Sequence, residues 1–155
     1  MFKFKKKEFA FTLLKEEDVE TCIEMIKTSA KGVKWRDEFL RNLLLNKSTI
    51  GFIARKDGKE VGVIIGSILV NPVINFVCIT DRESLMKGLD GMLIDEFIKE
   101  VKRRQPRAPH VTVSLAAEDT HAVALYSWKG FVIEGFVKRG LHNRDMVLMR
   151  RDLTH

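Results

Sequence analysis

Cysteine is scarce in this chain, and the two cysteines are far apart. Only Cys22 and Cys78 occur among the 155 residues, the first in a predicted helix and the second in a predicted strand. Two thiols in such positions are too few for a disulfide framework or a zinc site. The sequence therefore predicts no bound metal and a reducing compartment, with the cytoplasm as the default location.

Long apolar runs are also missing. The longest apolar stretch, near 61–70, is interrupted by Gly62, Gly66 and Ser67, whereas a membrane-spanning helix needs roughly 20 consecutive apolar residues. The N-terminus lacks the apolar core of a signal peptide, and no internal repeat, low-complexity tract or interdomain linker is found. We therefore expect one soluble domain over residues 1–155 with no membrane partner, in which residues 1–8 form a basic N-terminal segment.

Positive charge is in modest excess. The chain has 27 Lys and Arg against 21 Asp and Glu, a net charge of +6, while 45% hydrophobic and 31% charged residues are ordinary for a globular protein. Part of the excess is local, at Lys3, Lys5, Lys6 and Lys7 and again within 102–107. A polyanion would suit such patches, but many soluble proteins reach this charge without one. A nucleic-acid partner is therefore the weakest of the functional hypotheses.

Hydrophobic periodicity predicts an alternation of strands and helices. Apolar runs with period two, or continuous ones, indicate strands, and apolar residues three and four apart indicate helices. Asp57-Gly58 favours a tight hairpin, and a strand, a helix and a strand in succession imply a parallel crossover. The expected fold class is mixed α/β. Strands are predicted at 9–14, 49–55, 60–69, 73–80, 110–115, 131–138 and 146–150. Four helices are predicted, over 19–26, 37–45, a part of 85–104 and 120–129.

The stretch 85–104 joins a glycine-bearing turn to a long amphipathic helix. The turn follows the apolar run 73–80, and the helix carries Leu89, Leu93 and Phe97 on one face. The first N–H groups of such a helix lack partners, and its dipole is positive at that end. The pattern favours an anion such as phosphate at the start of this helix. A plain helix start after a loop is the alternative.

The stretch 119–131, DTHAVALYSWKGF, resembles a segment of the GNAT-superfamily N-acetyltransferases. In that segment a polar residue is followed by Ala at three, Leu-Tyr at six and seven, and Gly-Phe four and five beyond the Tyr. The order of elements from Phe9 to Leu153 is similar as well. The resemblance implies a splayed, mixed sheet of seven strands flanked by about four helices. It also implies that acetyl-coenzyme A (acetyl-CoA) is wedged where the fourth and fifth strands part.

The family's phosphate turn reads Arg or Gln, two residues, Gly, one residue, then Gly or Ala. It falls on 85–90 here, where only Gly88 is kept. Leu85 supplies no guanidinium, and Asp90 brings a carboxylate that repels phosphate unless it points away. A shift of one residue would let Gly91 serve as the second glycine. The resemblance implies three groups of donor-binding residues: the backbone of Cys78, Ile79 and Thr80; the turn Lys87, Gly88, Leu89, Asp90, Gly91 and Met92; and Asp119, which can equally be a helix N-cap.

One tyrosine matches the residue that protonates the departing coenzyme A thiolate in the family. This is Tyr126, and a phenol with a pKa of about 10 stays protonated for that role at neutral pH. A tyrosine that packs its helix onto the sheet is the alternative. Cys78 has no histidine partner in the pattern, so a buried thiol is favoured over covalent catalysis. Ser114 stands where some relatives keep a glutamate base, which leaves Glu118, Glu134, His121 or ordered water as candidates for the base.

Three functional hypotheses follow. The leading one is direct transfer of an acetyl group from acetyl-CoA to a primary amine of a small molecule, a protein or a peptide. The second is a GNAT-fold protein that binds an acyl-CoA as a sensor or accessory domain with degenerate catalysis, as Leu85, Asp90 and Ser114 suggest. The third is the basic nucleic-acid-binding module. Acceptor specificity is expected from 16–46 and 140–144, whose charges favour neither sign, and a homodimer is compatible with the sequence.

Overall fold

The computed structural model describes residues 8–29 and 34–153 of the chain. Lys3, Lys5, Lys6 and Lys7 lie outside the described residues, and so does the patch predicted from them. In chain order the elements are β1 (Ala10–Leu13), a 3₁₀ turn (Glu16–Asp18), α2 (Val19–Ser29), α3 (Asp37–Leu45), β2 (Thr49–Lys56), β3 (Lys59–Ser67), β4 (Val73–Ile79), α4 (Arg82–Met86), α5 (Leu89–Arg104), β5 (His110–Ala116), α6 (Thr120–Trp128), β6 (Val132–Val137), a second 3₁₀ turn (Leu141–Asn143) and β7 (Met146–Asp152).

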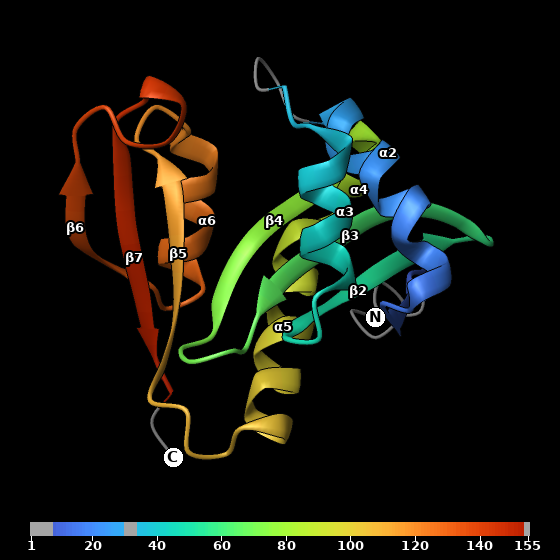
Figure 1. Cartoon of the computed structure of the whole chain (residues 1–155), viewed down its shortest axis with the longest axis horizontal. Coiled ribbons are helices and arrows are strands. Elements are labelled where there is room, and N and C mark those ends of the chain that lie inside the picture. Colours follow the sequence, from blue (N-terminus) through green and yellow to red (C-terminus); the bar gives the residue numbers. More distant parts are fainter. Residues whose placement is uncertain (1–7, 30–33, 154–155) are drawn as a thin grey trace.

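The strands form one mixed sheet of seven, in the order β1-β2-β3-β4-β5-β7-β6. Neighbouring strands are antiparallel except β4 and β5, which run parallel. The tight hairpin between β2 and β3 is confirmed, because Asp57 and Gly58 both adopt the positive φ that its two central residues require, 51° and 78°. The predicted strands and the parallel crossover are therefore confirmed (Figure 1).

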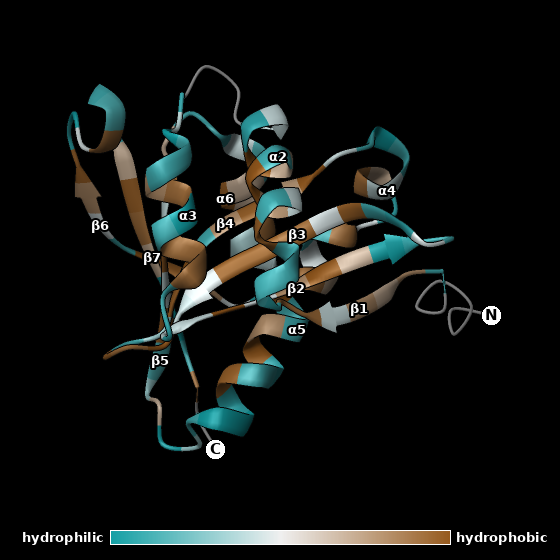
Figure 2. Cartoon of the chain, turned by 45° about the vertical axis from the view of Figure 1, so that its right-hand side comes forward, coloured by the Kyte–Doolittle hydropathy of each residue, from teal (hydrophilic) through white to brown (hydrophobic). Residues whose placement is uncertain are grey.

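Helices cover both faces of the sheet. In the view of Figure 1, α2 and α3 lie in front of the strands and α5 and α6 lie behind them. The core behind the sheet contains Leu93 and Phe97 of α5, and the core in front contains Ile26 of α2 and Leu40 of α3, all fully buried. Strands covered on both faces need apolar residues throughout, and β2 and β3 are hydrophobic along most of their length (Figure 2).

The parallel strands β4 and β5 are joined over a short length only. Their register contains two residue pairs, Val73 with Thr112 and Ile74 with Val113. Beyond these pairs β4 continues to Ile79 and β5 continues to Ala116, and the two strands diverge (Figure 1). The predicted splay is therefore present, at the C-terminal ends of both strands.

The helix count differs from the prediction. Residues 82–86, for which no separate helix was predicted, form the short helix α4, so the described residues contain five α-helices rather than four. The side chain of Asp81 caps this helix by accepting the backbone N–H of Ser84 at 3.0 Å, which is a cap signal that the sequence carried. The long helix α5 accordingly begins at Leu89. Gly130 follows α6 with a φ of 90°, as expected of a residue that ends a helix.

Candidate active site

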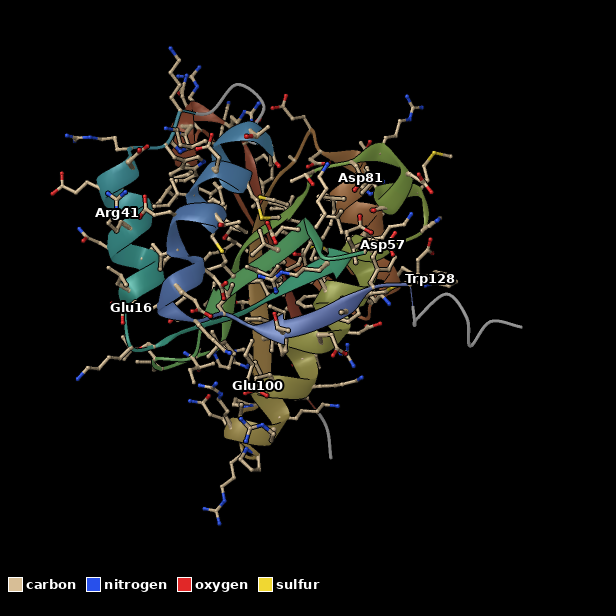
Figure 3. The ribbon with its side chains drawn as sticks, turned by 90° about the vertical axis from the view of Figure 1, so that its right-hand side faces the viewer. Glu16, Arg41, Asp57, Asp81, Glu100 and Trp128 are labelled. Carbon is tan, nitrogen blue, oxygen red and sulfur yellow. The ribbon has the colours of Figure 1, made fainter. Side chains whose placement is uncertain are left out.

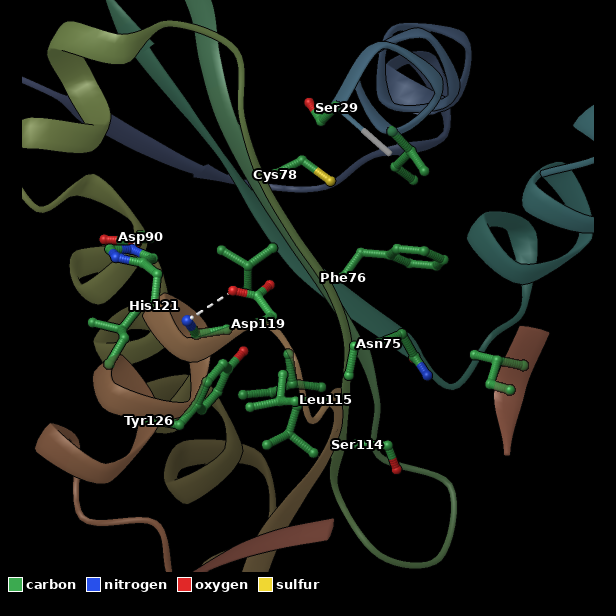
Figure 4. Close-up of a pocket in the computed structure, with 18 of the residues that line it drawn as sticks. Ser29, Asn75, Phe76, Cys78, Asp90, Ser114, Leu115, Asp119, His121 and Tyr126 are labelled. Carbon is green, nitrogen blue, oxygen red and sulfur yellow. Dashed lines mark hydrogen bonds and ion pairs between the residues drawn. The ribbon is translucent and has the colours of Figure 1, made fainter. Parts of the chain in front are cut away.

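A cleft of about 390 Å³ opens where β4 and β5 part. Its walls come from both strands, the start of α5, the first turns of α6 and the loop between β6 and β7 (Figure 4). The lining also contains Trp35, which precedes α3, two residues of α2, Leu85 of α4 and Met146 of β7. The cleft therefore connects the face covered by α5 and α6 with the face covered by α2 and α3.

The backbone of β4 faces the cleft at one of the predicted positions. Cys78 and Ile79 line the cleft, whereas the N–H of Thr80 donates to the carbonyl of Val61 at 2.9 Å and is used in the sheet. Successive backbone groups of a strand face opposite neighbours, so the N–H and C=O of Ile79 face the parted side, where an extended ligand can pair with them. Burial raises the pKa of the Cys78 thiol to about 11, so this thiol stays protonated and is not an activated nucleophile.

Helix α6 places Tyr126 in the cleft. Asp119 caps this helix as predicted, because its carboxylate accepts the N–H of Ala122 at 3.1 Å. The tyrosine ring packs edge-on against Phe131 with 5.1 Å between ring centroids, and its hydroxyl points into the cleft (Figure 4). Burial raises the pKa of the Tyr126 phenol above its usual value, and the negative charge of Asp90 adds to this effect. The cleft therefore contains a phenol that is held in its protonated form.

The turn between α4 and α5 only partly matches the expected phosphate cradle. Gly88 caps α5 with a left-handed φ of 81°, a conformation that favours glycine. The ammonium of Lys87, predicted as a point charge for phosphate, contacts the carboxylates of Glu8 and Glu83, the latter at 3.0 Å. These contacts raise the pKa of Lys87, the hydrogen bond to Glu8 most of all. Lys87 is thus already engaged by two acidic side chains.

The side chain of Asp90 lies in the wall of the cleft and does not point away from it. Asp90 is 6% exposed; one carboxylate oxygen accepts the N–H of Gly91 at 2.8 Å, and the other lies 3.0 Å from Nε2 of His121. Leu89 is fully buried in the core, and the N–H of Met92 donates within the helix to the carbonyl of residue 88 at 3.1 Å. The start of α5 therefore presents a carboxylate–imidazole pair to the cleft.

Sequence reasoning did not predict the contact between Asp90 and His121. The signal was available in the topology. Each residue belongs to the first turn of a helix that follows one of the two parallel strands. Because the carboxyl ends of parallel neighbours meet at one edge of the sheet, the two first turns must lie close together.

The candidates for a general base are differently placed. Glu118 pairs with Arg144 at 3.0 Å, and Glu134 of β6 pairs with Arg150 at 3.1 Å, and neither glutamate is among the described residues that line the cleft. Ser114 does line it. The described carboxylates in the lining are those of Asp90 and Asp119.

Aromatic rings close the end of the cleft that lies on the α2 and α3 face. Trp35 stacks on Phe39 with 5.4 Å between ring centroids and contacts Phe76 of β4 edge-on at 5.1 Å. His142 belongs to the loop between β6 and β7 and has a φ of 55°. Its ring meets Trp35 edge-on, with 4.9 Å between ring centroids. This cluster, which sequence reasoning also missed, joins the two halves of the parted sheet. In Figure 4, Phe76 lies on the opposite side of the cleft from His121 and Asp90.

Solved structures show the same arrangement of elements. No protein-family model matches the chain, and no curated protein sequence matches it either. The ribosomal-protein-S18-alanine N-acetyltransferase of Escherichia coli superposes with a TM-score of 0.83 at 15% identity, over 95% of each chain. A GNAT-family acetyltransferase of Streptococcus pneumoniae gives 0.75 at 19% identity, over 95% of this chain and 100% of the other. Mutant forms of the spermidine/spermine N-acetyltransferase of Vibrio cholerae give 0.74 at 16% identity, over 94% of each.

The chain has the GNAT acetyltransferase fold. The fold resemblance stated from the sequence is thereby confirmed, including the parting of β4 and β5. None of the helices in the described part of this GNAT fold combines the length and the apolar character that a membrane crossing requires. Within residues 8–29 and 34–153, no three His, Cys, Asp or Glu side chains converge as metal ligands would.

The basic end of α5 is partly neutralised in this GNAT fold. Arg103 and Arg104 both contact the carboxylate of Glu100, Arg103 at 2.7 Å. Figure 3 labels Glu100 on this helix. Two of the cations on which the nucleic-acid hypothesis depended are therefore paired within their own helix. This arrangement weakens that hypothesis relative to the two that involve the cleft.

Proposed function

We propose that this protein is an acetyl-CoA-dependent N-acetyltransferase that passes the acetyl group directly to a primary amine. The observation that carries the proposal is the cleft between the parted parallel strands, into which the hydroxyl of a protonated, buried tyrosine points. The GNAT fold of the chain supports it. The acceptor is proposed only as a primary amine, of a small molecule or of a peptide.

The donor would lie along the edge of β4 that faces the cleft. The N–H and C=O of Ile79 would pair with its extended pantetheine arm, and its diphosphate would lie near the start of α5, where Asp90 lines the cleft. The amine would enter from the α2 and α3 face, past Trp35. This arrangement brings an amine and a thioester together from opposite faces of one sheet, which removes the entropic cost of their encounter.

Tyr126 would act as the general acid of the transfer. The amine nitrogen attacks the thioester carbonyl carbon, the carbon–sulfur bond breaks, and the departing thiolate takes the phenolic proton. The attacking nitrogen releases its proton to ordered water, which then restores the phenol. Cys78 takes no covalent part, because its thiol is held protonated.

The test measures thiol release from acetyl-CoA over a panel of amines. Tyr126→Phe removes the acid and is expected to lower kcat by about 100-fold or more, since general acid catalysis contributes that much, while acetyl-CoA still raises the melting temperature. Ser127→Ala is the matched control, because it removes a hydroxyl from the same helix that bonds only the carbonyl of Val123. Equal turnover by wild type and Tyr126→Phe would refute the proposed role of the phenol.

A second candidate function is acyl-CoA binding without efficient transfer. It is favoured by the start of α5, where Asp90 occupies the cleft wall and Lys87 is engaged by Glu8 and Glu83. In that case acetyl-CoA would stabilise the protein by mass action, yet no amine in the panel would release thiol above the rate without enzyme.

A further inference from the structure

The cleft contains a histidine whose surroundings suit a specific task. His121 belongs to the first turn of α6, and its side chain is 67% exposed, whereas the Asp90 side chain that it contacts is 9% exposed. Nε2 lies 3.0 Å from one oxygen of Asp90, and the other oxygen is fixed by the N–H of Gly91. The carboxylate is thus held from two sides, and it orients the imidazole ring.

This end of the cleft is short of available cations. Leu85 carries no charge, and the ammonium of Lys87 contacts Glu8 and Glu83. Among the described residues that line the cleft, the side chains able to carry a positive charge are His121, His142 and Arg144. Of these, His142 packs on Trp35 at the aromatic end and Arg144 pairs with Glu118. His121 alone of the three contacts a residue of α5.

We propose that His121 is the side chain that contacts the donor's diphosphate and that Asp90 positions it. The inference rests on the proposed function, because it takes acetyl-CoA as the ligand of the cleft. A carboxylate only accepts hydrogen bonds, so neutral His121 carries its one proton on Nε2 and points the lone pair of Nδ1 outward. Protonation places an N–H on Nδ1 and cancels the charge of Asp90. The pair then changes from repelling a phosphate oxygen to donating to it.

Other charged or titratable groups lie on the elements around this pair. They are Asp95 of α5, Tyr126 of α6 and Lys129 just after it, Glu118 and Asp119 before α6, Cys78 of β4, Glu83 and Lys87 of the α4 segment, and His142 and Arg144 of the loop between β6 and β7. Lys129 is bonded to Asp95 at 2.8 Å, and burial keeps the thiol and the phenol protonated. His142, the other imidazole among the described residues that line the cleft, packs against Trp35 on the opposite face.

The test is a calorimetric titration with dephospho-CoA between about pH 5.5 and 8.5, the range over which imidazole groups change charge. Dephospho-CoA keeps the diphosphate and lacks the 3′-phosphate, which itself titrates near this range. Wild-type protein is expected to bind about tenfold more weakly at the upper end, since a charge-assisted hydrogen bond is lost. His121→Lys keeps a cation at every pH and is expected to bind with nearly constant affinity. His121→Gln is expected to bind weakly throughout.

Two further measurements separate contact from positioning. Pantetheine, which has no phosphate, should bind wild type and His121→Gln alike at every pH. Asp90→Asn removes the repelling charge and the carboxylate that orients the ring, so its affinity for dephospho-CoA at the upper pH should exceed that of wild type. Because His121 contacts the nearly buried carboxylate of Asp90, the unfolding temperature of each variant is measured beside its affinity.

The outcomes distinguish this inference from the proposed function. Binding of dephospho-CoA that is equal in wild type and His121→Gln, or a pH dependence that pantetheine shares, would overturn the role of His121 and leave the transferase proposal standing. Failure of acetyl-CoA and dephospho-CoA to bind at any pH would overturn both.

Discussion

The chain contains a single tyrosine, so the ionisation of Tyr126 can be followed without interference. Burial is the main cause that raises the pKa of this phenol, and the charge of Asp90 is the next. A phenol in the unfolded chain titrates at about pH 10. Folded protein is therefore expected to show no tyrosinate absorbance at pH values where denatured protein is already ionised. The measurement is a spectrophotometric pH titration of both states.

The same shift predicts how stability depends on pH. Burial raises the pKa of Tyr126 in the folded state, so its contribution to the free energy of unfolding is fully present below about pH 10. Above that pH only the unfolded state releases the phenolic proton, and the free energy of unfolding falls by about 1.4 kcal/mol for each pH unit. Urea unfolding of wild type and Tyr126→Phe on either side of that pH isolates this slope from lysine titration. Native tyrosinate that forms at the same pH as in denaturant would refute the burial argument.

Three other perturbations have outcomes that follow from the structure. The hydrogen bond from Arg103 lowers the pKa of Glu100 from 4.5 to about 2. Glu100 therefore contributes stability above pH 4.5 that is lost as the pH falls toward 2. Glu100→Gln should lower the free energy of unfolding at pH 7 by about 1–2 kcal/mol in urea titrations. Gly66→Ala places a Cβ 2.3 Å from a backbone carbonyl and should cost about 2–3 kcal/mol in the same assay. Trp35→Ala should raise KM for the amine roughly tenfold and leave KM for acetyl-CoA unchanged.

Each of these variants has a matched control. Glu96→Gln removes an acidic partner of Lys99 at an exposed pair in the same helix and should change stability little. In Gly62→Ala the three atoms nearest to the new Cβ are ends of flexible side chains, the closest at 2.9 Å, so this variant should cost less than Gly66→Ala. Trp128→Ala removes the other tryptophan, which is 85% exposed. Equal effects of a variant and its control would contradict the corresponding argument.

The fold could be predicted from the sequence where local signals agreed with tertiary structure. Asp57-Gly58 specified its hairpin through backbone conformation alone, and Asp119 with Gly130 bounded α6 through capping chemistry. Helix α4 was missed because a segment of five residues is too short to show the periodic hydrophobic pattern of a helix. Its N-cap, Asp81, was the only local sign of it.

The candidate site was harder to predict because its chemistry arises between segments that are far apart in the chain. Tyr126 could be found from its own segment. The proximity of Asp90 and His121 could be expected only from the parallel strands that bring two helix starts together, and no feature of the sequence indicated the contact of Trp35 with His142. The family pattern has a small residue at the position of Asp90, and only the packing of α5 beside α6 shows that His121 contacts this carboxylate.

The two-pair junction between β4 and β5 has a consequence for cooperativity. Because β4 and β5 share only two residue pairs, the β1–β4 and β5–β7 parts of the sheet are joined by backbone pairing at one end only. Separation of the two parts would expose the backbone amides of β4 and β5 beyond these pairs, which have no partner across the strand junction. Amide hydrogen exchange at the C-terminal ends of β4 and β5 should therefore be faster than in the β2–β3 ladder. A ligand bound between the two strands should slow this exchange.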